Sequence, residues 1–424
     1  MDRLDDRLGR PDGLGWWLQS QGGSGLVVIP PPKVVPLRRD GVKLVRPDGS
    51  LWKYRFVTGF RGPELYKLGE KNWLEEFYGD VIAHAGNGLR VFAMWNNTKY
   101  WPHSCPDYYD KLWDFCDHAE RFGLYVHLTA FCDQVDNSDV RLTPADQDEH
   151  MEQCIAIARE RENVLLEIEN ETFKNGGNAW ASRFPSDMFE GTLAMRSTWE
   201  DGEDPSLGGW LSLSTKHLDR KVEWTRGGKV LHEVQYEGLG AYPPGRVPAL
   251  SGEPDRIGNG QIGVTTPRQH ADNAAVTELM GLGGCLHGGY SSFDADHDSD
   301  LQNCRFTGSP NALACAWAIA DVWKSDIFDV RVGTTEHLVR GTENNDGDCP
   351  TVHWDRYNED APNNHPTDGL CRTYYKFLDG KAYGLGVDPA PQWPGYETRN
   401  GWRIVAQGGY TGDGHGGNML RLER

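Results

Sequence analysis

Between Tyr54 and about Asp326, short apolar segments alternate with longer amphipathic segments, and this pattern constrains the fold more than any other feature of the sequence. Such alternation is typical of repeated βα units whose strands form a parallel sheet. The segments that we predict to be strands are residues 54–60, 89–95, 124–131, 164–169, 210–214, 230–236, 247–252 and 284–288. Eight βα units within about 270 residues predict a (β/α)8 TIM barrel, which usually occupies about 250 residues.

The segments between the predicted strands carry helix signals. One of them repeats apolar residues at helical spacing and is followed by Gly123, which we expect to end the helix; the residues are Leu112, Phe115, Cys116, Ala119 and Phe122. Three Ser/Thr–Pro pairs each predict an N-cap with proline at the first helical position: Thr143–Pro144, Thr266–Pro267 and Ser309–Pro310. The last predicted helix has four residues on one face: Leu313, Trp317, Ala320 and Trp323.

The regions on either side of the predicted barrel (residues 51–326) differ from it in composition and periodicity. Residues 1–50 are rich in Gly and Pro, and we predict an N-terminal extended arm that ends in an RPDG turn at 46–49. After residue 326 the helical periodicity disappears, and short alternating segments predict a small C-terminal β-sandwich over residues 327–424. This region either packs on the barrel or binds glycan, and we favour packing.

The composition excludes several classes of partner. A net charge of −19, from 62 acidic and 43 basic residues, argues against nucleic acid and against an anionic membrane surface. The nine cysteines show no C-x-x-C spacing, so we expect mostly free thiols and no metal or other cofactor. The N-terminus lacks the pattern of a signal peptide, which predicts a cytoplasmic protein or one exported, or particle-associated, by a non-classical route. A neutral substrate fits this charge.

Acidic residues follow two of the predicted strands at the end where barrel active sites lie. The fourth strand leads into Asn170 and Glu171, and the seventh leads into Glu253. Cleavage of a glycosidic bond requires two carboxyl groups, one to protonate the leaving oxygen and one to attack or to activate water. A single Glu at a strand end is more often an ion-pair or helix-cap partner, so the prediction depends on the pair.

The fourth strand with its Asn-Glu resembles the corresponding motif of clan A glycoside hydrolases, which include the family 5 cellulases and mannanases. The resemblance implies that Glu171 is the acid/base and Glu253 the nucleophile. It also implies that Asn170 binds the 2-hydroxyl of the sugar, and that Arg90 orients the nucleophile and keeps it ionised. Tyr236, which ends the predicted sixth strand, resembles the tyrosine that donates a hydrogen bond to the nucleophile.

Other positions depart from the family 5 pattern. Phe131 stands where a histidine normally ends the third strand, and His127 lies too early in that strand. The histidine expected two residues before Tyr236 is Val234 here. No tryptophan follows the eighth strand where the clan normally has one. These departures leave the family and the substrate undetermined.

Three more residues are predicted to contact substrate. His287 lies in the segment GGCLHGGYSSF, which resembles the apiosidase-type members of the clan. Trp95 and Asn96 end the second strand and could line a sugar subsite, although a structural role for this tryptophan is nearly as plausible. The 16 Trp and 16 Tyr of the chain suit sugar rings, but large barrels also bury many aromatic residues.

The implied mechanism is retaining, which requires the two carboxyl groups to stand about 5–5.5 Å apart and Glu171 to be protonated at rest. Two alternatives remain. One is a non-catalytic carbohydrate-binding barrel protein in a larger assembly, although such a protein has no need of the glutamate pair. The other is a metal-dependent hydrolase that uses His287 with the acidic loop of residues 294–300, but the chain lacks an H-E-x-x-H pair, and a solvated loop explains the acidic run more simply.

Overall fold

The computed structural model describes residues 17–20, 26–29, 33–40, 43–94, 102–131, 142–170, 184, 186–198, 213–217, 249–253, 271, 274–275, 278, 284–286, 310–325, 327, 339–340, 372–378, 381–387, 401–410 and 417–424. The structural statements that follow concern these residues. In some strands, among them the one that ends at Glu253, the backbone alone is described.

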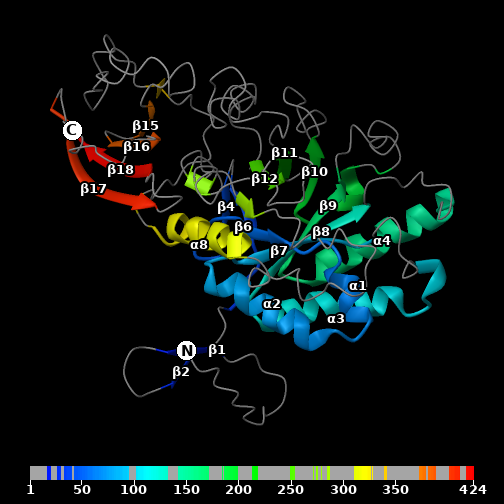
Figure 1. Cartoon of the computed structure of the whole chain (residues 1–424). Helices are drawn as coiled ribbons and strands as arrows, with labels where there is room; N and C mark the ends of the chain where they lie inside the picture. Colours follow the sequence, from blue (N-terminus) through cyan, green and yellow to red (C-terminus); the bar gives the residue numbers. More distant parts are fainter. Residues whose placement is uncertain are drawn as a thin grey trace, which may run out of the picture.

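Eight parallel strands form the central sheet (Figure 1). In chain order they are β6 (Arg55–Thr58), β7 (Gly88–Phe92), β8 (Tyr125–Phe131), β9 (Val164–Glu169), β10 (Ala194–Thr198), β11 (Leu213–His217), β12 (Ala249–Glu253) and β13 (Gly284–Leu286). Neighbours in the sheet are neighbours in the chain from β6 to β12, and β13 pairs with β6. This is the order that a (β/α)8 barrel requires. A ladder between β12 and β13 is not among the pairings of the described residues, so closure of the barrel remains a prediction.

The predicted positions of the fifth and sixth strands are wrong. The fifth strand of the sheet is β10, a segment that was not predicted to be a strand because only its first two residues, Ala194 and Met195, are apolar. The predicted fifth strand, residues 210–214, overlaps β11, which is the sixth strand of the sheet. The predicted sixth strand, residues 230–236, lies outside the described residues.

Five helices are described, together with two short 3-10 helices. They are α1 (Gly62–Lys67), α2 (Lys71–Ala83), α3 (Tyr108–Arg121), α4 (Pro144–Glu160) and α8 (Pro310–Lys324), with η1 (Pro102–Ser104) and η2 (Ser186–Phe189). Helix α3 buries the predicted apolar face, and Gly123 follows it with a φ of 76°. Thr143 caps α4 as predicted, and it forms a capping box with Asp146. The Thr266–Pro267 pair lies outside the described residues.

Of the face that its spacing predicted for helix α8, Ala320 and Trp323 are buried, but Trp317 is not. Trp317 is 47% exposed and lies against the imidazole of His84, at the end of α2. The buried positions are filled largely by small and aliphatic side chains, among them Cys315, Ala316, Ala318, Ile319 and Val322. Small residues let this helix approach its neighbours closely.

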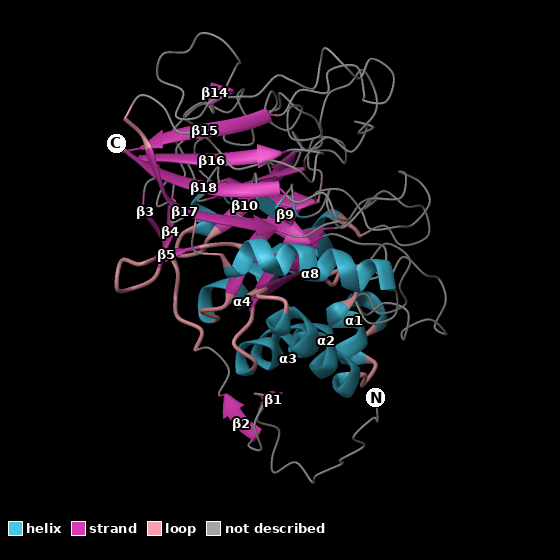
Figure 2. Ribbon diagram, turned by 60° about the vertical axis from the view of Figure 1, so that its left-hand side comes forward, coloured by secondary structure: helices cyan, strands magenta, loops and turns pink. Residues whose placement is uncertain are grey.

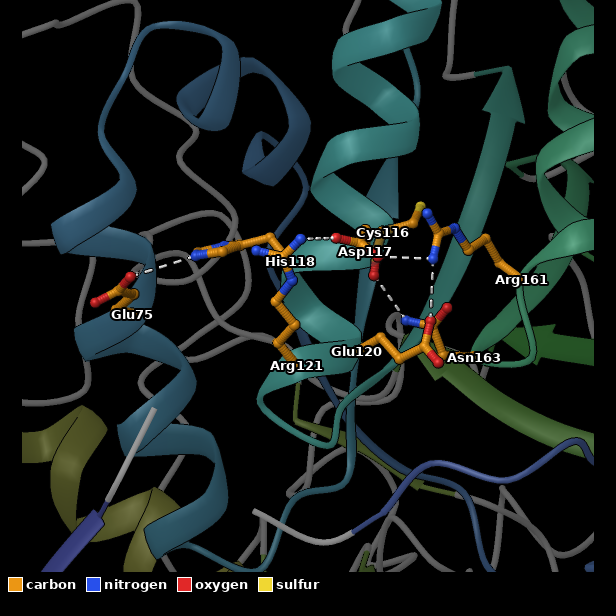
Figure 3. A network of polar contacts seen from close by, with 8 residues as sticks. All are labelled: Glu75, Cys116, Asp117, His118, Glu120, Arg121, Arg161 and Asn163. Carbon is orange, nitrogen blue, oxygen red and sulfur yellow. Dashed lines mark hydrogen bonds and ion pairs between the residues drawn. The ribbon is translucent and has the colours of Figure 1, made fainter. Parts of the chain in front are cut away.

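The sheet packs against α1 to α4 through one face of its strands (Figure 1). Leu89, Val91, Val126 and Leu128 alternate with inward-facing residues and join one buried apolar cluster with residues of these helices, such as Phe115. A polar network links α2, α3 and the segment before β9 (Figure 3): His118 Nε2 lies 3.3 Å from Glu75 Oε1, Arg161 pairs with Asp117, and Asn163 donates to two backbone carbonyls. We regard this network as structural, because it lies at the amino-terminal ends of the strands.

A second buried cluster fills the opposite, inner face near the amino-terminal ends of the strands. It contains an aromatic layer, which we define as Trp52, Tyr54, Phe56 and Tyr125; the rings of Tyr54 and Phe56 are stacked with centroids 3.9 Å apart. Leu44 joins it from a small antiparallel sheet of β3 (Arg38–Asp40), β4 (Lys43–Val45) and β5 (Leu51–Trp52).

The small sheet extends the fold into the region that was predicted to be an arm. The RPDG turn joins β4 to β5: the Gly49 N–H donates to the Arg46 carbonyl, and Gly49 has a φ of 83°. The Tyr125 hydroxyl donates to the carbonyl of Val35 at 2.9 Å. This sheet therefore covers the amino-terminal end of the central sheet. Upstream of it, β1 (Trp17–Ser20) and β2 (Leu26–Ile29) form an antiparallel hairpin.

The C-terminal region contains a five-stranded antiparallel sheet, which lies beside α8 (Figure 2). Its order is β14 (Val339–Arg340), β15 (Arg372–Leu378), β16 (Lys381–Val387), β18 (Gly417–Glu423) and β17 (Arg403–Tyr410). Tyr383 and Met419 are buried in the same apolar cluster as the helices. This contact supports packing on the barrel. The second layer of a β-sandwich and the domain boundaries at residues 50 and 326 remain predictions.

Candidate active site

Toward the carboxyl-terminal ends of the strands, the inner face of the sheet changes from aromatic to charged. We call this part the charged layer and define it as Arg90, His127, Thr129, Glu167 and Asn170, all of which are at most 3% exposed. The strand register explains why these side chains meet. Arg90 of β7 lies opposite His127 of β8, and Thr129 of β8 lies opposite Glu167 of β9, so the four side chains share one face.

One oxygen of Glu167 is the centre of this layer. Its Oε2 accepts hydrogen bonds from Arg90 Nε at 3.1 Å and from Arg90 Nη2 at 2.8 Å. It also accepts from the hydroxyl of Thr129, and His127 Nε2 lies 3.0 Å from it. Donors from two neighbouring strands therefore converge on one buried carboxylate, an arrangement that favours its ionised form.

The guanidinium of Arg90 joins Glu167 to Asn170. Its Nη2 donates to Asn170 Oδ1 at 2.8 Å as well as to Glu167. Burial by itself lowers the pKa of Arg90, but the Glu167 carboxylate outweighs this effect, so the pKa of Arg90 is raised and the side chain is a cation. The rings of Phe60 and Phe92, stacked 4.2 Å apart, lie beside the guanidinium with centroids 5.6 and 5.5 Å from its central carbon.

Asn170 is held through its backbone as well as its side chain. It follows the last residue of β9, and its N–H donates to the carbonyl of Phe131 at 2.9 Å, which extends the β8–β9 ladder by one bond. Because its Oδ1 accepts from Arg90, the amide is oriented so that Nδ2, a donor, points away from the guanidinium. The position that follows Asn170 in the chain is Glu171.

His127 connects the charged layer to the aromatic layer. The hydroxyl of Tyr54 lies 2.6 Å from His127 Nδ1. Burial raises the pKa of Tyr54 well above its ordinary value, so this hydroxyl stays protonated and is able to donate to Nδ1 when that nitrogen carries no proton. A neutral imidazole then carries its proton on Nε2, the nitrogen that faces Glu167. This assignment supplies a donor for each acceptor along the chain from Tyr54 to Glu167.

The structure brings only some of the predicted site residues together. Arg90 and Asn170 are in direct contact. Glu253 is the last residue of β12, the seventh strand of the sheet, which is the position that the sequence predicted for it. The remaining predicted residues lie outside the described part of the chain: Trp95, Asn96, Glu171, Tyr236 and His287.

Two details of the predicted site require correction. Tyr236 was expected to end the sixth strand, but the sixth strand of the sheet is β11, which ends at His217. Tyr236 itself lies outside the described residues, so its hydrogen bond to the nucleophile stays a prediction. His127 was set aside as lying too early in its strand, yet it is fully buried in the charged layer.

Sequence reasoning missed Glu167, Thr129 and Tyr54 as members of the site. A signal was present: β8 and β9 are buried along their whole length and nevertheless carry His127 and Glu167 in their interiors. A charged residue in a fully buried strand requires a partner, so each such residue indicates a polar network. Within the described residues there is no group of His, Cys, Asp and Glu that could hold a metal ion, and no helix there has the length and apolarity to cross a bilayer.

Solved structures resemble the chain in fold. One is described as a glycoside hydrolase, with a TM-score of 0.55, 11% identity and coverage of 92% of this chain and 97% of that one. A glycoside hydrolase family 5 structure from Bacteroides vulgatus has a TM-score of 0.55 at 9% identity and covers 92% of both chains. A beta-glucanase from Saccharophagus degradans in complex with cellotetraose has a TM-score of 0.51 at 14% identity, with coverage of 70% of this chain and 98% of the enzyme.

No protein-family model and no curated protein sequence matches the chain. At identities between 9% and 14%, the structural likeness shows the fold alone. The chain thus shares the fold of glycoside hydrolases of family 5, as the resemblance of its Asn-Glu motif implied. The likeness of residues 284–293 to the apiosidase-type members stays a prediction.

Proposed function

We propose that the protein is a retaining glycoside hydrolase that cleaves O-glycosidic bonds of an oligosaccharide or polysaccharide. Glu171 is the acid/base and Glu253 the nucleophile. The fold that the chain shares with glycoside hydrolases supports the class of reaction. The beta-glucanase with bound cellotetraose makes β-linked glucans the first substrates to test.

The observation that carries the proposal is the position of Asn170 and Glu253. They stand at the carboxyl-terminal ends of the fourth and seventh strands of one parallel sheet. Parallel strands end on the same edge of a sheet, so Glu171, the neighbour of Asn170, belongs to the same edge as Glu253. Three strand intervals separate β9 from β12, and in a closed barrel of eight strands this spacing sets the two glutamates across the mouth from each other.

In the first step the Glu253 carboxylate attacks the anomeric carbon while Glu171 gives its proton to the oxygen of the leaving group, and the glycosidic bond breaks. In the second step Glu171 takes a proton from water, whose oxygen attacks the anomeric carbon and releases Glu253. Both steps require the carboxyl groups to be about 5–5.5 Å apart. The negative charge of Glu253 keeps Glu171 protonated at the start.

The substrate contacts follow from the same arrangement. Asn170, fixed by Arg90, presents its amide donors to the 2-hydroxyl oxygen of the sugar, a bond that strengthens in the transition state. Trp95 and Asn96 from the end of the second strand, and His287 after the eighth, contribute further contacts. A net charge of −19 favours neutral glycans over anionic ones.

The test is hydrolysis of aryl glycosides and of β-glucans by the parent and by Glu171→Gln and Glu253→Gln. Each variant should lose at least about a thousandfold in kcat/KM on polysaccharide, because each removes a group that bonds to reacting atoms. Glu162→Gln is the matched control, since Glu162 is exposed and lies just before β9, at the opposite end of the same strand; its activity should equal that of the parent.

Azide separates the two roles. With Glu171→Ala it should attack the glycosyl-enzyme and give a glycosyl azide of retained configuration, whereas with Glu253→Ala it should give the inverted product. Unchanged hydrolysis by Glu253→Gln would overturn the assignment of the nucleophile. A parent that binds β-glucans but hydrolyses none of the substrates would indicate the alternative, a non-catalytic carbohydrate-binding protein.

A further inference from the structure

We propose that Glu167 is a positioning residue of this site, which fixes Arg90 and, through it, the amide of Asn170 beside the proposed acid/base. The inference rests on the proposed function for the chemistry, but it concerns side chains that take no part in the two steps above. Glu167 touches no reacting atom in this scheme. It acts by setting the place and the charge of its neighbours.

The first support is the way in which Glu167 is held. Both Glu167 and Arg90 are 0% exposed, so neither side chain can exchange its partner for bulk water. Two guanidinium nitrogens donate to the same carboxylate oxygen, at 3.1 and 2.8 Å, and this fixes the rotation of the planar group. Thr129 donates to that oxygen from the neighbouring strand.

The second support is that one nitrogen makes two bonds. Arg90 Nη2 donates to Glu167 Oε2 at 2.8 Å and to Asn170 Oδ1 at 2.8 Å. A terminal guanidinium nitrogen has two hydrogens, so each bond uses one of them. If the bond to Glu167 is lost, Arg90 is free to turn about its last torsions, and the oxygen of Asn170 loses a fixed donor. The side chain of Glu167 thereby controls the orientation of Asn170.

The third support is that Glu167 is also held by residues of the neighbouring strands. His127 approaches it from β8 and is itself held by the Tyr54 hydroxyl, 2.6 Å from Nδ1. The titratable groups that face this layer are Arg90 from β7, His127 from β8, Tyr54 before β6, Cys285 of β13 and Glu169 of β9, which is fully buried on the same face of the strand as Glu167. Burial raises the pKa of Cys285 to about 12, so its thiol is neutral. Arg90 and Glu167 form an ion pair of one cation and one anion.

Because Glu167 balances the charge of Arg90, its removal should change the pH dependence of catalysis. A residue that only filled space would not have this effect. With Glu167 present, the pair contributes no net charge to the mouth of the sheet. Replacement of Glu167 by glutamine keeps the size and leaves the cation of Arg90 uncompensated. An unbalanced cation close to the two proposed catalytic carboxyl groups stabilises their ionised forms and lowers the pKa of both.

The experiment compares Glu167→Gln with Glu167→Asp. For the glutamine variant, kcat on a β-glucan should fall by about a hundredfold with little change in KM, because the proposed acid/base region is misaligned. Both limbs of its pH–rate profile should move to lower pH by about one unit. The aspartate variant keeps the charge but shortens the side chain, so its kcat should fall while the profile stays in place.

Glu278→Gln is the matched control. Glu278 is also buried, at 4% exposed, and its carboxylate accepts from Arg55 Nε at 2.8 Å and pairs with Lys53, but this cluster lies at the amino-terminal end of the sheet. The same chemical change there should leave kcat, KM and the pH profile unchanged. If Glu278→Gln and Glu167→Gln reduce activity alike with unshifted profiles, Glu167 has only a structural role and the proposal is wrong.

Crystal structures of the same variants test the inference without turnover. In Glu167→Gln the distance from Arg90 Nη2 to Asn170 Oδ1 should increase beyond hydrogen-bond range, whereas in Glu278→Gln it should stay near 2.8 Å. If Glu167→Gln does not fold, Glu167→Asp is compared with Glu278→Asp in the same way. An inactive parent in which Asn170 still moves would refute the proposed function and leave the positioning intact; an active Glu167→Gln with Asn170 unmoved would refute the positioning alone.

Discussion

The two ends of the inner face of the sheet are buried equally well but are built from opposite kinds of side chain. At the amino-terminal ends the aromatic layer, from Trp52 to Tyr125, stacks ring on ring. Toward the carboxyl-terminal ends the charged layer connects Arg90 to Glu167 and Asn170. Tyr54 and His127 are the contact between the two layers.

The difference between the two layers suggests that the aromatic layer serves stability and the charged layer serves the proposed function. Full burial of an aromatic side chain stabilises a fold by roughly 1.5–3 kcal/mol, whereas a buried ion pair is often no more stabilising than apolar residues of the same volume. A sheet that needed only stability could fill both ends with rings. A charged layer at the end where the proposed substrate binds is therefore better explained by what it does to substrate.

The largest effect on stability is expected in the aromatic layer. Phe56→Ala removes a ring that is 0% exposed and stacked on Tyr54, and it should lower the free energy of unfolding by about 3–5 kcal/mol. The kcat of the molecules that remain folded should not change. Urea unfolding and initial rates, measured on the same sample, check both statements. A fall in kcat at full folding would show that the two layers are not separable in this way.

A second prediction concerns His150, a buried histidine outside both layers. Burial lowers its pKa to about 4, and it binds the Ala130 carbonyl through Nε2 at 2.8 Å. An unfolded chain takes up this proton below about pH 6.5, and the folded chain does so only near pH 4. Stability is therefore lost as the pH falls through this window, by about 3 kcal/mol between pH 7 and pH 4.

The matched variant is His150→Gln, which keeps a donor and an acceptor but does not titrate. The free energy of unfolding should depend less steeply on pH in this variant than in the parent. Equal slopes from pH 7 to pH 4 would mean that His150 takes up its proton at the same pH in the folded protein as in the unfolded chain. A shallower slope in the variant would show that His150 is buried as a neutral group, in contrast to the paired charges of Arg90 and Glu167.

The smallest effect is expected from added volume in the aromatic layer. A Cβ atom at Gly88 would lie 2.3 Å from the ring of Phe56, so Gly88→Ala forces that ring to move. We expect a loss of about 1–3 kcal/mol. The double variant with Phe56→Leu should lose less stability than the sum of the two single losses, since the smaller leucine side chain leaves room for the added methyl group. Strict additivity would show that the layer is loosely packed.

The first four strands of the central sheet could be predicted from the sequence. Strand β9 was predicted at its observed bounds, residues 164–169, because four of its six residues are large and apolar, as is typical of a buried parallel strand. Strand β10 could not be predicted this way, since Arg196, Ser197 and Thr198 make up more than half of it. We expected most of the nine cysteines to be free thiols, and the five that the structure describes are free.

The site was predicted less completely than the fold. Asn170 and Arg90 were identified through a family resemblance, and their contact could not be deduced from residues 80 positions apart. Glu167 is separated from Arg90 by 77 positions, and in the sequence it is one of two acidic residues, with Glu169, in a strand that is otherwise apolar. What joins them is the register of β7, β8 and β9, which depends on the whole sheet and not on any local pattern.

The pairing of β13 with β6 has a consequence for how the chain is made. Thr58 and Leu286 are in contact although they are 228 residues apart. Strand β6 therefore cannot pair with β13, its second neighbour in the sheet, until most of the chain has been synthesised. Contacts of such long range slow folding. During synthesis the free edge of β6 exposes backbone donors and acceptors of the kind that promote aggregation. This edge of β6 therefore stays unpaired until the eighth strand has been synthesised.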